Sequence, residues 1–187
     1  MSFSELDLFA KFDFESVAPV LVDVGAHHGT FSYAFAQKGW QVIAFEPEAN
    51  NYAAFQRNLA GFEKVTCTKK AVSDTTGEKV PFYVSDEHFG IHALKPFHET
   101  HRLAYEVETV RLDDVLRDLH IPQVTLLKID IEGADFLALK GFDFEQYQPE
   151  LVILEFMDER SSSNFSYTHH DVATYMDKCG YTTFVSE

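Results

Sequence analysis

Cysteine is scarce in this sequence: 187 residues contain only Cys67 and Cys179, which stand far apart. No C-x-x-C pair occurs, so we expect neither a disulfide framework nor a zinc ribbon, and the cytoplasm is the expected compartment. No run reaches the roughly 18 apolar residues of a membrane span, and the first residues lack the basic segment of a secretory signal. These absences predict a cytoplasmic globular protein without a membrane anchor.

Positive charge is also in short supply. Fifteen lysines and arginines stand against 30 aspartates and glutamates, which gives a formal net charge of −15. Long-range repulsion opposes docking on nucleic acid or on an anionic membrane, so we expect neither as a partner. A small neutral substrate remains compatible with this charge, and the net negative charge favours a cationic ligand. The length fits a single domain over residues 1–187 with one core.

Two common phosphate-binding signatures are missing as well. No G-x-x-x-x-G-K-[ST] run occurs, which excludes a P-loop nucleotide site. The run VDVGAHHGT, residues 22–30, has His27 where the dinucleotide fingerprint G-x-G-x-x-G has its second glycine. That glycine lets the backbone close on a pyrophosphate, so an imidazole there disfavours NAD and FAD.

The chain does contain an apolar strand, residues 20–24, that leads into a glycine loop and then a helix. A second strand ends on Glu46, about 20 residues after Gly25, which is the spacing of a nucleotide-cofactor fold. A carboxylate there can accept both ribose hydroxyls. S-adenosylmethionine carries no phosphate: Asp23 would suit its ammonium, directly or through water, and the N–H groups of residues 25–29 its carboxylate. The alternative is a tight strand-to-helix turn without a ligand.

Strands and helices alternate along most of the chain, which predicts an α/β fold with a doubly wound, mostly parallel sheet. Ligands bind such sheets at the carboxyl ends of the strands, and acidic residues stand at four of these ends: Asp23, Glu46, Asp130 and Glu155. We expect strands at residues 20–24, 41–45, 64–68, 80–84, 106–111, 124–131, 151–156 and 181–185. We expect helices at residues 29–38, 47–59, 112–119, 134–140 and 169 to about 180, the last opened by a capping box at Thr168 and Asp171.

Two segments fall outside this alternation. Residues 1–17 mix apolar and acidic side chains and predict a short helical extension at the edge of the domain. Residues 85–104 show no clean period and carry four histidines, at positions 88, 92, 98 and 101. A loop of that length inside a compact domain is usually functional, so we expect it to form the substrate side of the site.

Several blocks of the sequence, taken together, resemble the FkbM family of S-adenosylmethionine-dependent methyltransferases. The stretch KIDIEGA, residues 128–134, is the most specific, and the order of the blocks fits over about residues 18–160. The resemblance implies a Rossmann-like class I methyltransferase fold and O-methylation of a hydroxyl on a sugar, glycan or natural product. The blocks are VDVGAHHGTF (22–31), FEP (45–47), AVSDTTG (71–77), VRLDDV (110–115), LKIDIEGADFLALKGF (127–142) and LVILEF (151–156).

Carried onto this sequence, the resemblance implies a glycine loop under the methionine moiety, Glu46 on the ribose, residues 71–73 near the adenine and Asp130 facing the reacting methyl group. The complete set of expected cofactor-binding residues is Asp23, Gly25, Ala26, His27, His28, Gly29, Glu46, Pro47, Ala71, Val72, Ser73 and Asp130.

The sequence departs from the family pattern in two places. The family more often has asparagine and a small or aliphatic residue where His27 and His28 stand, and these larger polar rings could reach toward substrate. The sequence also ends after what we interpret as a sixth strand, whereas the fold normally closes with an antiparallel seventh. This leaves room for a sheet without that strand, in a shortened family member or a piece of a longer biosynthetic protein.

Methyl transfer to a hydroxyl requires alignment and a base near the acceptor oxygen. Asp130 is the first candidate for this base, although it could equally anchor the methionine ammonium. Glu132 is the second, with a helix N-terminal carboxylate as the alternative. His92 is the third, although a loop histidine is more often only solvated. The adjacent histidines at 27–28 and 169–170 lack the i, i+4 spacing of a zinc site, so we expect no metal.

Lys128 lies inside an apolar strand, and we expect it to pair with Glu155 or Asp23; a lysine that extends to water is the alternative. Two other functions stay open at this point. One is a domain that binds S-adenosylmethionine without catalysis within a larger protein. The other is an NAD-dependent oxidoreductase, which His27 disfavours.

Overall fold

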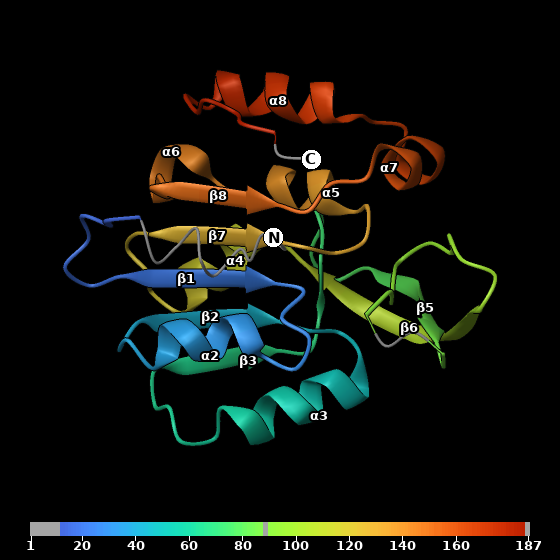
Figure 1. The fold of residues 1–187 in the computed structure, drawn as a ribbon, viewed down its shortest axis with the longest axis horizontal. Helices are drawn as coiled ribbons and strands as arrows, with labels where there is room; N and C mark the ends of the chain where they lie inside the picture. Colours follow the sequence, from blue (N-terminus) through green and yellow to red (C-terminus); the bar gives the residue numbers. More distant parts are fainter. Residues whose placement is uncertain (1–11, 88–89, 186–187) are drawn as a thin grey trace, which may run out of the picture.

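The main sheet of the protein has five parallel strands in the order β3-β2-β1-β7-β8 (Figure 1). The computed structural model describes residues 12–87 and 90–185. The predicted α/β fold with a mostly parallel sheet is therefore confirmed. The strands are β1 (Val20–Val24), β2 (Gln41–Phe45), β3 (Val65–Thr68), β7 (Leu126–Ile129) and β8 (Leu151–Leu154).

Helices cover both faces of this sheet, as expected for a doubly wound fold. In Figure 1, α2 lies in front of the strands and α4 lies behind them. The capping box predicted at Thr168 and Asp171 is present and opens α8. The helices are α2 (Thr30–Ala36), α3 (Ala49–Asn58), α4 (Leu112–Asp118), α5 (Asp135–Lys140), α6 (Phe144–Tyr147), α7 (Asp158–Phe165) and α8 (His169–Lys178). None of those described is long and apolar enough to cross a membrane.

Alternate residues of each central strand enter different halves of the core. In β1, Leu21 packs in a cluster with Phe35 of α2 and Phe55 of α3, whereas Val22 packs in a cluster with Leu116 of α4. Successive side chains of a strand point to opposite faces, so a strand buried on both faces must be apolar almost throughout. The polar residues within β1 and β7 are therefore not explained by packing of the core.

A second, three-stranded sheet lies beyond the carboxyl ends of the main strands (Figure 1). Its strands are β4 (Ala71–Val72), β5 (Lys79–Ser85) and β6 (His101–Val110), in the order β4-β6-β5, with β5 antiparallel to β6. The hydroxyl of Tyr105 on β6 accepts the N–H of Ala49 at 3.2 Å, which ties this sheet to the start of α3. The small sheet thus forms a wall against the edge where ligands are expected.

Several predicted boundaries around the small sheet are wrong. The expected loop over residues 85–104 is shorter, because β5 continues to Ser85 and β6 already begins at His101. Residues 71–72, which lie outside the expected strands, pair with β6 as β4. Short α6 and the serine-containing α7 were both missed. These elements depend on distant neighbours, which the local sequence pattern does not show.

The two ends of the chain also differ from expectation. The predicted strand over residues 181–185 is wrong: this segment is irregular, and Phe184 is 91% exposed. A strand needs a hydrogen-bonded neighbour, and the described part of the chain offers this segment none. The predicted N-terminal helix lies mostly in residues 1–11, outside the described residues, and residues 12–16 are irregular.

Gly25 allows the loop after β1 to touch the end of β7. Its φ is +80°, and a Cβ added there would lie 1.9 Å from the backbone oxygen of Asp130. Its N–H also donates to the carbonyl oxygen of Phe45 at the end of β2, at 3.0 Å. Three strand ends meet around this glycine, so no side chain fits there.

We predict that Gly25→Ala destabilises the protein far more than Gly39→Ala, the matched control. Gly39 has a φ of +82° but nothing within 4 Å of an added Cβ, so this control has only the left-handed strain, about 1–2 kcal/mol. Gly25→Ala adds a backbone clash and should lower the free energy of unfolding by at least about 2 kcal/mol more. Urea unfolding followed by circular dichroism measures both variants; equal losses would contradict the prediction.

Candidate functional site

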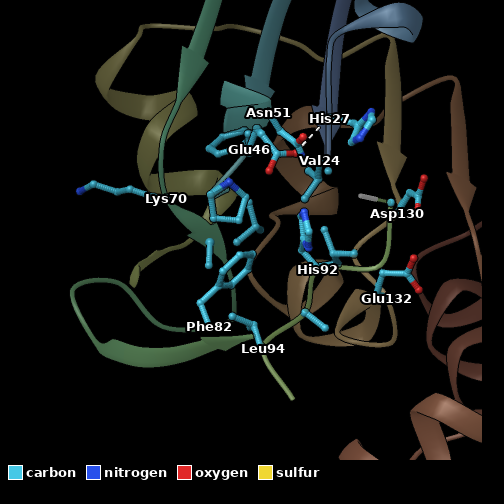
Figure 2. Close-up of a pocket in the computed structure, with 18 residues that line it drawn as sticks. Val24, His27, Glu46, Asn51, Lys70, Phe82, His92, Leu94, Asp130 and Glu132 are labelled. Carbon is cyan, nitrogen blue, oxygen red and sulfur yellow. Dashed lines mark hydrogen bonds between the residues drawn. The ribbon is translucent and has the colours of Figure 1, made fainter. Parts of the chain in front are cut away.

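A cavity opens at the carboxyl ends of β1, β2 and β7 (Figure 2). Its volume of about 300 Å³ is at the lower end of the range for ligand pockets. In Figure 2, Glu46 and Asn51 lie at one end, Phe82 and Leu94 at the other, and Asp130 along one side. The predicted site residues that line it are Gly25, His27, Glu46, Pro47, Ala71, Val72, His92, Asp130 and Glu132. Those that do not line it are Asp23, Ala26, His28, Gly29 and Ser73.

Half of the cavity wall was not anticipated from the sequence. Phe82 and Leu94 come from β5 and the segment between β5 and β6, whose placement over the main sheet has no local signal. Asn51 lies five residues after Glu46, on the first turn of α3. The complete set of missed lining residues is Val24, Phe45, Asn51, Lys70, Phe82, Gly90, Ala93, Leu94 and Ile131.

The Glu46 carboxylate is held in the cavity by two backbone N–H groups. The N–H of His27 donates to one of its oxygens and the N–H of Glu48 to the other, each at 2.8 Å. The residue is 5% exposed. Burial raises the pKa of Glu46 to about 7, although the two N–H groups act in the opposite direction. The carboxylate is thus fixed in orientation and desolvated, and it can accept hydrogen bonds from a ligand.

The N–H groups of the glycine loop are already used within the protein, which corrects one expectation. Gly25 and Ala26 both donate to the Phe45 carbonyl at 3.0 Å, His27 donates to Glu46, and Gly29 donates to the Ala26 carbonyl at 2.8 Å. These groups were expected to bind the carboxylate of the methionine moiety. They shape the loop instead, and none of these four points its donor at a ligand.

A buried ion pair lies directly behind the cavity. The strand register places Asp23 of β1 beside Lys128 of β7, and the lysine Nζ lies 3.7 Å from Asp23 and 3.2 Å from the Asp130 carboxylate. The expected pairing of Lys128 with Asp23 is confirmed. Ser32 donates to Asp23 at 2.6 Å. Because Asp23 is fully buried and lines no part of the cavity, it contacts the site through Lys128, and Asp130 presents the accessible carboxylate.

The loop after β7 holds two further acids with different tasks. Glu132, at a φ of +58°, lines the cavity and forms an ion pair with Arg160 of α7. Asp135 is buried and accepts the N–H groups of Ile131, at 3.2 Å, and Gly133, at 3.0 Å. The alternative that Glu132 serves the N-terminus of the next helix is wrong, because Asp135 occupies the first turn of α5. Burial raises the pKa of Asp135 to about 7.

His92 is half-buried at the centre of the cavity in Figure 2. Its Nδ1 accepts the N–H of Ser85 at 3.3 Å, so the neutral ring carries its proton on Nε2. Burial lowers the pKa of His92. The arrangement favours a neutral imidazole that donates from Nε2, which counts against His92 as the base.

The segment between β5 and β6 is fastened to α7 by cation–π contacts. The guanidinium of Arg160 lies 4.2 Å from the centre of the Phe97 ring, and the ammonium of Lys95 lies 4.6 Å from that of Phe165. Lys95 also donates to the Asn164 carbonyl. Since Arg160 holds Glu132 as well, one helix that the sequence pattern missed supports both the acidic side of the cavity and its cover.

No group of three metal-ligating side chains occurs in the part of the chain that the structure describes, so the expected absence of a metal stays a prediction. The rings of His27 and His28 stack, with centroids 3.9 Å apart and planes 25° apart. The two rings therefore lie face to face. His27 has a φ of +50°, which turns the backbone between the two rings.

The lining fits an adenosine-containing sulfonium better than a pyrophosphate. Glu46 can accept ribose hydroxyls, and Pro47, Val72 and Phe82 give an apolar surface for a purine. Behind the wall, Asp23 and Asp130 share the single cation of Lys128, which leaves one negative charge uncompensated. Lys70, the lysine in the lining, is in an ion pair with Glu108 at 2.7 Å. A cation is therefore favoured in this cavity.

Comparison with known proteins places this architecture in a family. The model of the methyltransferase FkbM domain matches residues 23–183. This chain belongs to the FkbM methyltransferase family. The sequence resemblance is thereby confirmed over a longer stretch than the motifs alone covered.

This FkbM domain has relatives in fungi and bacteria. It is 27% identical over 164 residues to Methyltransferase 1 of Beauveria bassiana (75% of this chain, 65% of that protein). It is 30% identical over 172 residues to Methyltransferase sdnD of Sordaria araneosa (70% and 62%). It is 22% identical over 161 residues to 2-O-methyltransferase NoeI of Sinorhizobium fredii (78% and 66%). The matches thus span 62 to 66% of these relatives' length.

We predict that Glu46 makes the FkbM domain less stable as the pH rises. The folded-state pKa of about 7 lies above the ordinary value of 4.5, so the folded state binds the proton more tightly. Wild-type stability should fall between pH 4.5 and 7 relative to Glu46→Gln, by about 3 kcal/mol in all. Urea unfolding of both proteins at pH 5, 6, 7 and 8 measures this. Asp135 titrates in both and cancels, and a constant difference would contradict the prediction.

Proposed function

We propose that this FkbM domain is an S-adenosylmethionine-dependent O-methyltransferase whose acceptor is a hydroxyl of a sugar, glycan or other natural product. The observation that carries the proposal is the Glu46 carboxylate, buried and held by two backbone N–H groups at the end of β2 beside an apolar wall. The family supports methyl transfer, and a relative named a 2-O-methyltransferase supports oxygen as the acceptor atom.

When bound, the cofactor would supply a methyl group already activated on a cationic sulfur. The residues of the chain would contribute binding, alignment and a place for the proton. Glu46 would hold the ribose, and the pair Lys128 and Asp130 would present one carboxylate at the cavity. The Asp130 side chain is 32% exposed, so it could accept the proton of an acceptor hydroxyl. Nε2 of His92 would donate to the acceptor rather than take its proton.

A domain that binds the cofactor without catalysis, within a larger biosynthetic protein, is the second candidate. The matched relatives are longer than the matched stretch, which is compatible with additional segments. An NAD-dependent oxidoreductase is disfavoured, because the N–H of His27 is directed at Glu46 and not at a phosphate. A cytoplasmic location and the absence of nucleic-acid and membrane partners stay predictions from composition.

We predict micromolar binding of S-adenosylmethionine and S-adenosylhomocysteine, and no binding of NAD. Isothermal titration calorimetry at pH 8, where Glu46 is ionised, measures all three ligands. Glu46→Ala should weaken the two nucleoside ligands about tenfold or more, because it removes charge-assisted hydrogen bonds. Binding of NAD alone would overturn the proposed function.

We predict that Asp130→Asn lowers the rate of methyl transfer by about 100-fold or more and changes cofactor affinity only a few-fold. The assay incubates labelled S-adenosylmethionine with a panel of glycans and natural-product precursors and identifies methylated hydroxyls by mass spectrometry. The same substitution with unchanged turnover would remove Asp130 as the base. Tight cofactor binding without transfer to any acceptor would favour the non-catalytic candidate.

A further inference from the structure

Asn51 is a buried amide that the fold itself does not use. It is 4% exposed and lines the cavity, on the first turn of α3. Its backbone N–H donates to the Glu48 side chain at 2.7 Å, which caps the helix. Its side-chain amide has no hydrogen bond to any residue that the structure describes. The polar side chain is therefore placed at the cavity and left without a protein partner.

Asn51 keeps only 4% of its surface exposed, so its amide has lost most of its hydrogen bonds to water and gains none from the described residues, which normally destabilises a protein. An apolar residue would serve the first turn of α3 at least as well, since asparagine is a weaker helix former than alanine or leucine. The position of Asn51 therefore indicates a partner that arrives with a ligand.

The neighbouring Glu46 indicates which ligand group that is. Figure 2 shows both residues at the same end of the cavity. An ionised carboxylate only accepts hydrogen bonds, so a ribose hydroxyl would donate a hydrogen bond to Glu46. The lone pairs of the hydroxyl oxygen would stay available to accept a hydrogen bond from another group. An amide NH2 group beside it can donate to that oxygen. The two side chains together satisfy both halves of one hydroxyl.

We propose that Asn51 is a cofactor-binding residue that donates a hydrogen bond from its amide to a ribose hydroxyl held by Glu46. This inference rests on the proposed function, because it requires an adenosine-containing ligand in the cavity. It adds a second polar contact that makes the site selective for the intact ribose. Asn51 and the Glu46 carboxylate, which the sequence spacing had indicated, would thereby recognise the ribose together.

The experiment compares Asn51→Ala with Asn50→Ala, a matched control. Asn50 is the exposed neighbour on the same turn, so its replacement deletes the same amide outside the cavity. Calorimetry at pH 8 titrates each variant and wild type with S-adenosylhomocysteine. It then repeats the titrations with 5′-methylthioadenosine and with the 2′-deoxy and 3′-deoxy forms of that nucleoside.

We expect Asn51→Ala to weaken S-adenosylhomocysteine about tenfold and Asn50→Ala to leave its affinity unchanged. Removing the hydroxyl that Asn51 contacts should weaken binding to wild type about tenfold more than binding to Asn51→Ala, because the variant has already lost the Asn51 contact and keeps only the Glu46 contact to that hydroxyl. Without ligand, the melting temperature of Asn51→Ala should equal or exceed that of wild type.

Three results would overturn the inference. If Asn51→Ala binds as tightly as wild type, the proposed function stands and the inference alone fails. If both deoxy analogues lose equal affinity in wild type and Asn51→Ala, the amide contacts another part of the ligand, such as the adenine. If unliganded Asn51→Ala melts well below wild type, Asn51 is structural. A wild type that binds no adenosine ligand overturns the proposed function itself.

Discussion

The carboxylate of Glu46 is the constraint on which the rest of the site depends. By accepting the N–H of His27 and the N–H of Glu48, it joins the loop after β1 to the turn that opens α3. Both bonds are made in a desolvated position, where an ionised carboxylate is costly unless a ligand brings further donors. The first of these bonds occupies the His27 N–H, so this N–H is not available to bind a phosphate as in a dinucleotide-binding fold. In the proposed function, discrimination against a pyrophosphate and binding of a ribose would therefore have one physical origin.

A second buried charge, Lys128, connects the main sheet to the acidic side of the cavity. It lies on a strand buried on both faces and is held between Asp23 and Asp130. Removing one partner would leave an uncompensated buried charge, which is far more destabilising than the pair is stabilising. The register of β1 against β7 and the orientation of Asp130 at the cavity are thus fixed by one group. Gly25 completes this connection, because only a residue without a side chain lets the β1 loop touch the Asp130 carbonyl.

The far wall of the cavity is built from parts that have little sequence signal. The small sheet brings Phe82 over the main strands, and α7 brings Arg160 to Glu132 and Phe97. Neither placement follows from periodicity: β4 is two residues long, and α7 contains consecutive serines that read as a loop. Asn51 was missed for a different reason. Its position shortly after Glu46 can be seen in the sequence, but only the structure shows that its side chain is buried at the cavity without a protein partner.

The sequence by itself determined the five parallel strands, the helices α2, α3, α4, α5 and α8, the family, and the acids at the strand ends. Each of these is encoded locally, in apolar runs such as residues 20–24, in glycine and capping signals, and in the spacing from Gly25 to Glu46. Only the tertiary structure decided which acids line the cavity. Asp23 and Asp130 both follow apolar strand residues, yet one is sealed beneath α2 and the other lines the cavity with a side chain that is 32% exposed. Side-chain exposure depends on which distant elements pack over a strand end, and such contacts leave no periodic trace in the sequence.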